Sequence, residues 1–235
     1  MEVLARSYMQ TESSAQVAYG TFAERLEQWT AAFEDLKLRS RNILNPAQHR
    51  AVALLEVEKR YFLSSMNQST GALGTKWADR PYHDPMRWDK QIALYDEIVE
   101  YSRMAVAPIH AADGSEGTAS PVFTFDYGCI PALFSVVARC RDPHIRRKAI
   151  NVLQQAPRQE GVWKSSLVAR VATSLMTLEE AGLDVVHTAS DIPASCRIDA
   201  VSVSMDPVSK RAIIHYNSQT RNHQDYLEWL SLIHI

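Results

Sequence analysis

Apolar residues recur at helical spacing in the first part of the chain. Phe22, Leu26, Trp29, Phe33 and Leu36 follow one another at intervals of four and three. Residues three and four apart lie on the same face of an α-helix, so this spacing predicts one continuous apolar stripe along a first amphipathic helix.

Two more helices are predicted before residue 108. Asn45 followed by Pro46 is typical of a helix start, since asparagine caps the first turn and proline lacks an N–H that the helix would leave unpaired. This second helix is expected to run to about Met66. Residues 70–85 contain two glycines and two prolines without periodicity, which predicts a loop. The third helix ends before Pro108, and its apolar face is formed by Trp88, Ile92, Tyr95, Val99 and Ser102.

Three further helices are predicted between residues 125 and 182. The first covers residues 131–140, where apolar residues again recur at helical spacing. The second begins after Asp142, a good N-cap residue that precedes a proline suited to the first turn, and it ends at Pro157. The third begins near Trp163 and ends at Gly182, because glycine is common just beyond a helix C-terminus.

The pattern changes after Gly182. Residues 197–205 alternate and residues 210–216 form a second short run, which predicts two strands joined by a turn at Asp206 and its following proline. A short final helix is predicted over residues 222–229. The expected fold class is mainly α: antiparallel helical hairpins in an irregular bundle or solenoid, with a small C-terminal β-hairpin.

These elements predict a single helical domain over residues 1–217 and a C-terminal tail over residues 218–235. The chain enters its first helix almost at once, so we expect the domain to be incomplete at its N-terminus. Residues 230–235 (LSLIHI) match the translation of a nucleotide string that resembles a transposon end used for sequencing libraries, and we expect them to be an artefact. The expected parts of the domain are N-terminal helices (1–108), a flexible connector (109–121), central helices (122–182) and the β-hairpin (196–217).

The composition is that of a globular domain. The chain has 235 residues, of which 46% are hydrophobic and 22% charged, enough to form a core of ordinary size. Its net charge is −2 and its pI about 6.4, whereas a free-standing nucleic-acid-binding domain usually carries a basic excess. No apolar run has the length of a membrane span, and no signal peptide is visible. The three widely separated cysteines suit a reducing compartment.

A basic run lies across the break between the first two central helices. The planar guanidinium of arginine suits phosphate, so the run is a candidate for nucleic-acid contact. The low net charge favours arginines that pack in the core and pair with carboxylates. Asp142 and Glu160 are available partners, and we expect an Arg–Glu160 pair to link this helical hairpin to the helix that follows. The run consists of Arg139, Arg141, Arg146, Arg147 and Lys148.

The sequence contains no recognisable catalytic or metal-binding motif. Cys129, Cys140 and Cys196 match no compact zinc motif and are interpreted as buried structural thiols. Residues 71–76 (GALGTK) lack the spacing of a phosphate-binding loop. Three histidine–aspartate pairs lack the spacing of metal ligands and are interpreted as surface residues: His83 with Asp84, His110 with Asp113, and His223 with Asp225.

Two sets of helical residues have competing interpretations. Acidic residues on amphipathic helices are interpreted as solvated, and these are Glu56, Glu58, Asp96, Glu97 and Glu100. Aromatic residues could line a pocket for a small effector, but at helical spacing they are more typical of a core; these are Trp88, Tyr95, Phe134 and Trp163.

The central segment also resembles a known family. The patterns PALF, CRDP-x-IRR-x-AI and R-x-EG-x-W, followed by a helix ending in LEE, are similar to the fungal-specific transcription factor regulatory region. That region occurs in binuclear zinc cluster (six-cysteine) transcription factors and in cluster-lacking relatives. We call the ten most distinctive matches the signature residues and expect them to be structural: Cys140, Arg141, Asp142, Pro143, Arg146, Arg147, Arg158, Glu160, Gly161 and Trp163.

The resemblance implies a regulatory or interaction region of a nuclear transcription factor, which acts through protein partners, self-association or a small effector. It implies no enzyme, no membrane contact and no direct contact with nucleic acid by this chain. A binuclear cluster needs six thiolates, so three cysteines cannot form one, and zinc would belong to an upstream segment. A cluster-free adaptor and a small-molecule-binding or enzymatic helical protein remain the alternatives.

Overall fold

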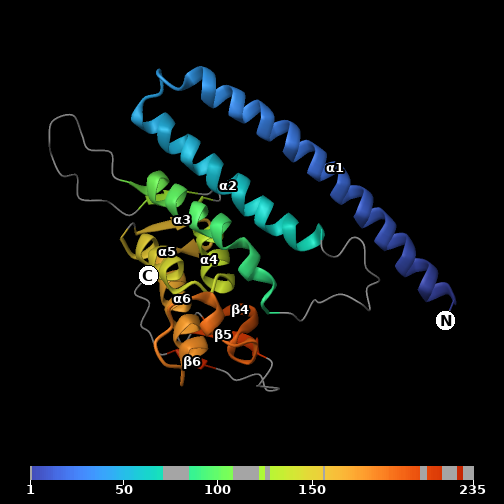
Figure 1. The fold of residues 1–235 in the computed structure, drawn as a ribbon, viewed down its shortest axis with the longest axis vertical. Helices are drawn as coiled ribbons and strands as arrows, with labels where there is room; N and C mark the ends of the chain where they lie inside the picture. The colour runs from blue at the N-terminus through green and yellow to red at the C-terminus, as the bar shows by residue number, and fades with distance from the viewer. Residues whose placement is uncertain are drawn as a thin grey trace.

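A computed structural model describes residues 2–70, 85–107, 122–124, 128–155, 157–206, 211–218 and 227–229. Two long helices, α1 (Glu2–Ser40) and α2 (Pro46–Thr70), form an N-terminal hairpin (Figure 1). Asn45 caps α2 as predicted, because its Oδ1 accepts the N–H of Gln48 at 2.9 Å and Gln48 Oε1 accepts the N–H of Asn45 at 2.9 Å.

Four helices pack as an irregular bundle next to α2. They are α3 (Ile92–Val106), which follows the 3-10 turn η2 (Arg87–Gln91), then α4 (Ile130–Arg139), α5 (Pro143–Gln155) and α6 (Ser165–Glu180). α4 contacts α2, α3, α5 and α6, and α3 also contacts α5. Helices that are not consecutive therefore meet, which distinguishes this bundle from a solenoid.

The main core surrounds α4. Ile130, Leu133 and Val136 of this helix are at most 1% exposed, as are Tyr95 and Ile98 of α3. The same core includes residues of α2, α5 and α6. Trp88 and Tyr95 are buried in this core, and Phe134 and Trp163 pack against it while partly buried, which agrees with the interpretation of these aromatic residues as core.

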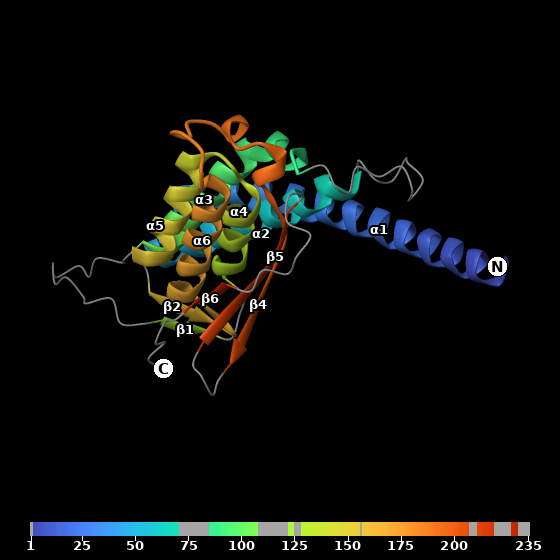
Figure 2. The same ribbon diagram turned by 90° about the horizontal axis from the view of Figure 1, so that it is seen from below.

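Two small sheets accompany the helices. β1 (Val122–Thr124) pairs in parallel with β2 (Arg158–Glu160), and β2 pairs antiparallel with β3 (Trp163–Lys164). In the second sheet, β4 (Ile198–Asp206), β5 (Arg211–Ser218) and β6 (Leu227–Trp229) are antiparallel. β4 and β5 project from the bundle (Figure 2), while Ile198, Ile214 and Tyr216 pack against α6. Two 3-10 turns, η3 (Ala189–Asp191) and η4 (Ala194–Cys196), precede β4.

The mainly α fold class and the β-hairpin are confirmed, and one prediction is corrected. The predicted final helix is wrong where the structure describes it, because Leu227–Trp229 forms β6. The helix expected to begin near Trp163 does begin close to it, at Ser165, and Trp163 itself belongs to β3. The first sheet has no counterpart among the predictions, because strands of two and three residues are too short to show alternation.

The predicted stripe of α1 is buried only in part. Phe33 is 4% exposed, whereas Phe22, Trp29 and Leu36 are 42%, 39% and 50% exposed. Among the described helices, α1 packs mainly against α2. A single main neighbour covers only one side of the stripe, so the rest of the stripe stays partly exposed.

Candidate functional site

The carboxylate of Glu179, near the end of α6, is the centre of a buried charged network. Arg141 donates to its Oε1 from Nη2 at 2.7 Å and from Nε at 3.2 Å. Nη1 of Arg146 lies 2.7 Å from Oε2. The backbone N–H of Ile198, the first residue of β4, donates to Oε1 at 2.6 Å. One carboxylate therefore joins the α4–α5 junction, the end of α6 and the start of the β-hairpin.

Both arginines of this network are almost fully enclosed. The side chains of Arg141, Arg146 and Glu179 are 0–1% exposed. Burial lowers the pKa of Arg141, although the Glu179 carboxylate opposes that change. Burial also opposes ionisation of Glu179, but the two guanidinium groups and the N–H of Ile198 outweigh it and lower the pKa of Glu179. Glu179 therefore forms ion pairs with both arginines, and all three side chains are charged inside the protein.

Both arginines also donate to backbone carbonyls. Arg141 donates to the carbonyls of Arg139 and Ile198, each at 2.5 Å, and Arg146 donates to the carbonyl of Val137 at 3.0 Å. Two of these carbonyls belong to the last turn of α4, and the third is that of Ile198 in β4. These contacts hold both guanidinium groups inside the protein.

Arg197 forms a second buried contact beside the first. Its Nη1 and Nη2 donate to Oδ1 and Oδ2 of Asp89 in η2, at 2.7 and 2.9 Å. The same side chain donates to the carbonyls of Ile192 at 2.8 Å, Ala189 at 2.6 Å and Pro85 at 3.2 Å. Arg197, just before β4, therefore binds η2 at the start of α3, whereas Ile198, the first residue of β4, binds Glu179 of α6.

Glu160 caps α4 rather than pairing with the basic run. Its carboxylate accepts the backbone N–H groups of Gly128 at 3.1 Å, Cys129 at 3.2 Å and Ile130 at 2.8 Å. Unpaired N–H groups at a helix N-terminus favour an anion, so a buried glutamate is stable there. Nη1 of Arg158, in the same strand, forms an ion pair with Oε1 of Glu160 at 3.7 Å.

The expected Arg–Glu160 link is therefore corrected. Glu160 does connect the strand after α5 to the start of α4, but it does so through backbone amides. Arg141 and Arg146 share Glu179 instead, because the end of α6 lies beside the α4–α5 junction.

Gly128 allows this cap to form. A Cβ atom at this position would lie 2.3 Å from Oε1 of Glu160, closer than two such atoms can approach. Glycine therefore lets the carboxylate reach the first amides of α4.

Other signature residues form local turns. Oδ1 of Asp142 accepts the N–H groups of His144 at 3.0 Å and Ile145 at 3.1 Å, which makes Asp142 the predicted N-cap of α5. Pro143 is the first residue of that helix. Gly161 has φ 55°, in the left-handed region that favours glycine, at the turn between β2 and β3.

Trp163 and the cysteines contribute to packing. The ring centroid of Trp163 lies 5.4 Å from that of Phe134, at the edge of the main core. Cys129 and Cys140 are each 1% exposed, and burial raises the pKa of each thiol to about 12. These thiols remain protonated near neutral pH and are not nucleophiles. Cys196 is only partly buried, contrary to its interpretation as a buried thiol.

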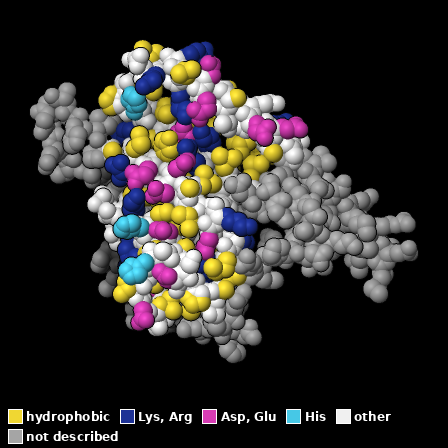
Figure 3. All heavy atoms as spheres, in the orientation of Figure 1, with side chains coloured by type: hydrophobic (Ala, Val, Ile, Leu, Met, Phe, Trp, Pro, Cys, Tyr) yellow, Lys and Arg dark blue, Asp and Glu magenta, His cyan; other side chains and the backbone are white. Residues whose placement is uncertain are grey.

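The exposed members of the basic run pair with acids of neighbouring helices. Arg147 Nη2 lies 3.1 Å from Glu180 of α6, and Lys148 Nζ lies 3.1 Å from Asp96 and 3.3 Å from Glu100 of α3. On the face seen in Figure 3, basic and acidic side chains are intermixed. The prediction that the arginines of this run pair with carboxylates is confirmed for Arg141, Arg146 and Arg147.

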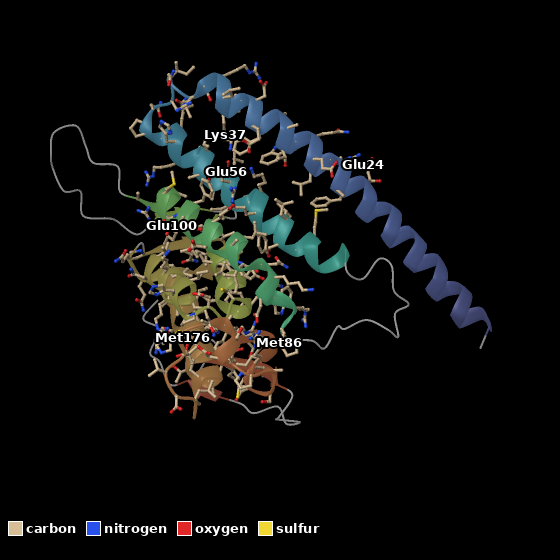
Figure 4. All side chains as sticks on the ribbon, viewed as in Figure 1. Glu24, Lys37, Glu56, Met86, Glu100 and Met176 are labelled. Atoms are coloured by element: carbon tan, nitrogen blue, oxygen red, sulfur yellow. The ribbon has the colours of Figure 1, made fainter. Side chains whose placement is uncertain are left out.

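Glu56 was expected to be solvated, and this is wrong. Its side chain is 1% exposed and lies between α1 and α2, where it contacts Lys37, Lys59 and Arg60. Figure 4 shows Lys37 and Glu56 facing each other across the two helices. Burial opposes ionisation, but the hydrogen bonds of the three cations lower the pKa of Glu56 to about 2. This cluster is the polar part of the α1–α2 contact.

Several segments and residue pairs discussed in the sequence analysis lie outside the described residues. They are residues 71–76, the connector 109–121, residues 230–235 and the histidine–aspartate pairs at 83–84, 110–113 and 223–225. Within the described ranges, no group of three or more His, Cys, Asp or Glu side chains is arranged to hold a metal ion. No described helix is both long enough and apolar enough to cross a membrane.

Glu179 and Arg197 are the residues whose roles sequence reasoning missed. Glu179 follows Leu175 by four residues and therefore continues the buried face of α6. A carboxylate at an apolar helical position is a sign of a buried ion pair, and this sign was present in the sequence. Arg197 is the first residue of the alternating segment 197–205, and alternation alone did not indicate that its charged side chain is buried.

Part of the chain is similar to a fungal transcription regulator. A segment of 111 residues is 33% identical to the aspercryptin biosynthesis cluster-specific transcription regulator atnN of Emericella nidulans. This segment is 46% of the chain and 18% of that protein, so the chain matches less than one fifth of the relative's length. No family model and no solved structure matches the chain. The similarity supports a relationship with fungal transcription factors and a regulatory role in general.

Proposed function

We propose that this chain is a regulatory and interaction region of a fungal transcription factor. The observation that carries the proposal is the similarity over 111 residues to a cluster-specific transcription regulator. The region would act in the nucleus by binding protein partners or an effector, and it would make or break no covalent bond.

The charged network supports a structural rather than a DNA-contacting role for the basic run. Arg141 and Arg146 are at most 1% exposed, and Arg147 pairs with Glu180. A nucleic-acid site relies on cations that are free to replace counterions around phosphates. We therefore assign DNA contact to a zinc cluster outside this chain, since its three cysteines cannot supply six thiolates.

The network also supports a single cooperative scaffold. Glu179 and Arg197 connect the β-hairpin to α3, the α4–α5 junction and α6. A partner or effector that binds one part of such a scaffold can influence the others only if it prefers one of two arrangements.

A reporter experiment tests the proposal. The full chain is fused to a heterologous DNA-binding domain in a filamentous fungus that carries a reporter gene with the matching site. We expect reporter expression to differ from that given by the DNA-binding domain alone. Glu180→Gln should retain the effect, because its ion pair is partly exposed, whereas Glu179→Ala should lose it by disrupting the scaffold.

Two results would contradict the proposal. One is unchanged reporter expression with a fusion that is shown to be folded and nuclear. The other is sequence-specific binding of duplex DNA by the purified chain at near-physiological salt, which would place DNA recognition in this region.

A further inference from the structure

Three rows of side chains run along α1 between residues 20 and 40. Residues seven apart lie on nearly the same line along a helix, so each row is a set of three residues at that spacing. The middle row faces α2: Phe33 is buried there with Lys59 of α2 over its ring, and Leu26 and Ser40 are partly buried. We name the rows on either side of it the polar row (Ala23, Thr30, Lys37) and the apolar row (Phe22, Trp29, Leu36).

α2 covers the polar row and leaves the apolar row at the surface. All three side chains of the polar row are partly buried, whereas those of the apolar row are 39–50% exposed. Two aromatic rings and a leucine would remove more apolar area from water than an alanine, a threonine and a lysine do, so the hydrophobic effect alone favours the opposite choice. Another interaction must therefore hold α1 in the observed rotation.

Two ion pairs between α1 and α2 account for that rotation. Lys37 of the polar row contacts the buried carboxylate of Glu56 (Figure 4), and Nζ of Lys59 lies 2.7 Å from Oε1 of Glu34. Glu34 follows Thr30 by four residues and so lies on the polar-row side of the helix. Both ion pairs are lost if this side of α1 turns away from α2.

A roll of α1 about its own axis exchanges the two outer rows. Successive residues are about 100° apart around a helix, so a roll of roughly 50° replaces the polar row by the apolar row at the contact with α2. Leu26 and Phe33 remain against α2 in both positions, because the middle row lies between the other two. Phe62 of α2, which is 41% exposed, already lies on the side of the apolar row, since its ring centroid is 5.8 Å from that of Phe22. The same roll therefore covers Phe62 as well.

We propose that α1 is a two-position helix: the Lys37–Glu56 and Lys59–Glu34 ion pairs hold it with the apolar row exposed, and it rolls onto that row when they are broken. The two positions share the middle row, so the change needs no unfolding of α1 or α2. A regulatory scaffold needs two arrangements that a partner can tell apart, and the roll supplies them. The use of the roll in regulation rests on the proposed function, whereas the roll itself does not.

Fluorine NMR of the full chain labelled with fluorotryptophan tests the proposal. The Trp29 signal is identified by its absence from Trp29→Phe, and the exposure of the ring is measured from the relaxation that a dissolved gadolinium chelate causes. Lys37→Met combined with Glu34→Gln removes both ion pairs between the helices, while Glu56 keeps Lys59 and Arg60 of its own helix. We expect the gadolinium effect on Trp29 to fall at least about twofold, because the ring turns onto α2.

A second pair of substitutions on the same helix is the matched control. Arg39→Met combined with Asp35→Asn also removes one base and one acid, but this ion pair lies within α1 and its side chains are 70% and 58% exposed. The gadolinium effect on Trp29 should therefore stay at the wild-type value. The single variant Lys37→Met, which keeps the contact between Glu34 and Lys59, should give an intermediate decrease.

The possible results separate a roll from detachment of the helix. Trp88 is 5% exposed in the bundle, and its protected signal shows in each variant that the bundle is folded. A folded double variant in which Trp29 keeps its wild-type exposure would overturn the proposal, and so would a rise in exposure, which would mean that α1 detaches. Protection of Trp29 together with a fusion that leaves reporter expression unchanged would contradict the proposed function alone.

Discussion

The backbone N–H of Ile198 donates to Glu179 Oε1 across 2.6 Å, so the first residue of β4 is held by a buried carboxylate of α6. Arg141, which is bound to the same carboxylate, donates to the carbonyl of Ile198 at 2.5 Å. Both backbone polar groups of Ile198 are therefore satisfied by side chains of the helical bundle. This contact sets where the β-hairpin begins relative to the signature residues.

Substitution of Glu179 is expected to be strongly destabilising. Glu179→Gln keeps the shape of the side chain but leaves Arg141 and Arg146 without a counter-charge inside the protein. Breaking one side of a buried ion pair costs about 3–5 kcal/mol in the free energy of unfolding. Urea unfolding followed by circular dichroism measures this loss.

The neighbouring residue provides the control for this substitution. Glu180 is 20% exposed and pairs with Arg147, which is 51% exposed. Glu180→Gln should change the free energy of unfolding by less than about 1 kcal/mol. Equal losses for both variants would show that the Glu179 network does not stabilise the fold as described.

Substitution of Gly128 tests the cap of α4. Gly128→Ala places a Cβ atom 2.3 Å from the carboxylate of Glu160, so the cap must move and its three backbone hydrogen bonds weaken. We expect the free energy of unfolding to fall by about 1–3 kcal/mol. The same substitution at Gly20 of α1, where nothing lies within 4 Å of an added Cβ, should stabilise the protein by about 0.5–1 kcal/mol. A neutral or stabilising Gly128→Ala would contradict the described cap.

The local rules of helix starts and turns were sufficient for much of the fold. Asn45 and Asp142 cap their helices as predicted, because a cap depends on residues within three or four positions along the chain. The pairing of β4 with β5 follows from the alternation, while the predicted turn after Asp206 lies outside the described residues. These features need no knowledge of distant segments.

Pairings between distant segments could not be predicted in the same way. The partner of Arg141 is 38 residues away and that of Arg197 is 108 residues away. The low net charge correctly indicated arginines that pair with carboxylates, but the partner predicted was Glu160, and Glu179 was not considered. The choice depends on which helix end lies beside the α4–α5 junction, and only the packed bundle determines that. Burial of Glu56 escaped prediction for the same reason, since its cations Lys37 and Lys59 come from two helices.

Acid should weaken the contact between α1 and α2 through Glu56. The pKa of Glu56 is lowered from its ordinary value to about 2. This carboxylate therefore stabilises the fold fully at pH values above the ordinary pKa of a glutamate. The contribution, up to about 3 kcal/mol, is lost as the pH falls from about 4.5 to about 2. We therefore expect Glu56→Gln to be destabilising at pH 7 and the difference from wild type to shrink below pH 4.5.

The more exposed partner of Arg60 serves as the control for Glu56. Glu97 also pairs with Arg60, but its side chain is 53% exposed. Glu97→Gln should have a small effect at both pH values because solvent screens this pair. If the difference between Glu56→Gln and wild type were independent of pH from 7 to 3, the ion-pair interpretation of Glu56 would fail.

Glu58 is expected to respond in the opposite direction. Burial, followed by the nearby carboxylate of Glu160, raises the pKa of Glu58. Such a group destabilises the folded protein once it ionises. The free energy of unfolding falls as the pH rises from the pKa in the unfolded state to the higher pKa in the folded state, and it stays lower at all higher pH values. Glu58→Gln removes the charge and should raise the Tm at pH 7. The rise should be small, roughly 1–3 °C, because Glu58 is partly solvated.

The pH dependence of this variant decides the cause. Below the ordinary pKa of a glutamate, Glu58 is neutral in both states, so the Tm advantage of Glu58→Gln should disappear near pH 4. Glu24→Gln, at an exposed position on α1, is the control for a general effect of removing one negative charge, and it should leave the Tm nearly unchanged. Thermal unfolding of the three proteins at pH 7 and pH 4 makes the comparison. A lower Tm for Glu58→Gln at pH 7 would mean that the carboxylate has a stabilising partner that outweighs both its burial and the repulsion from Glu160.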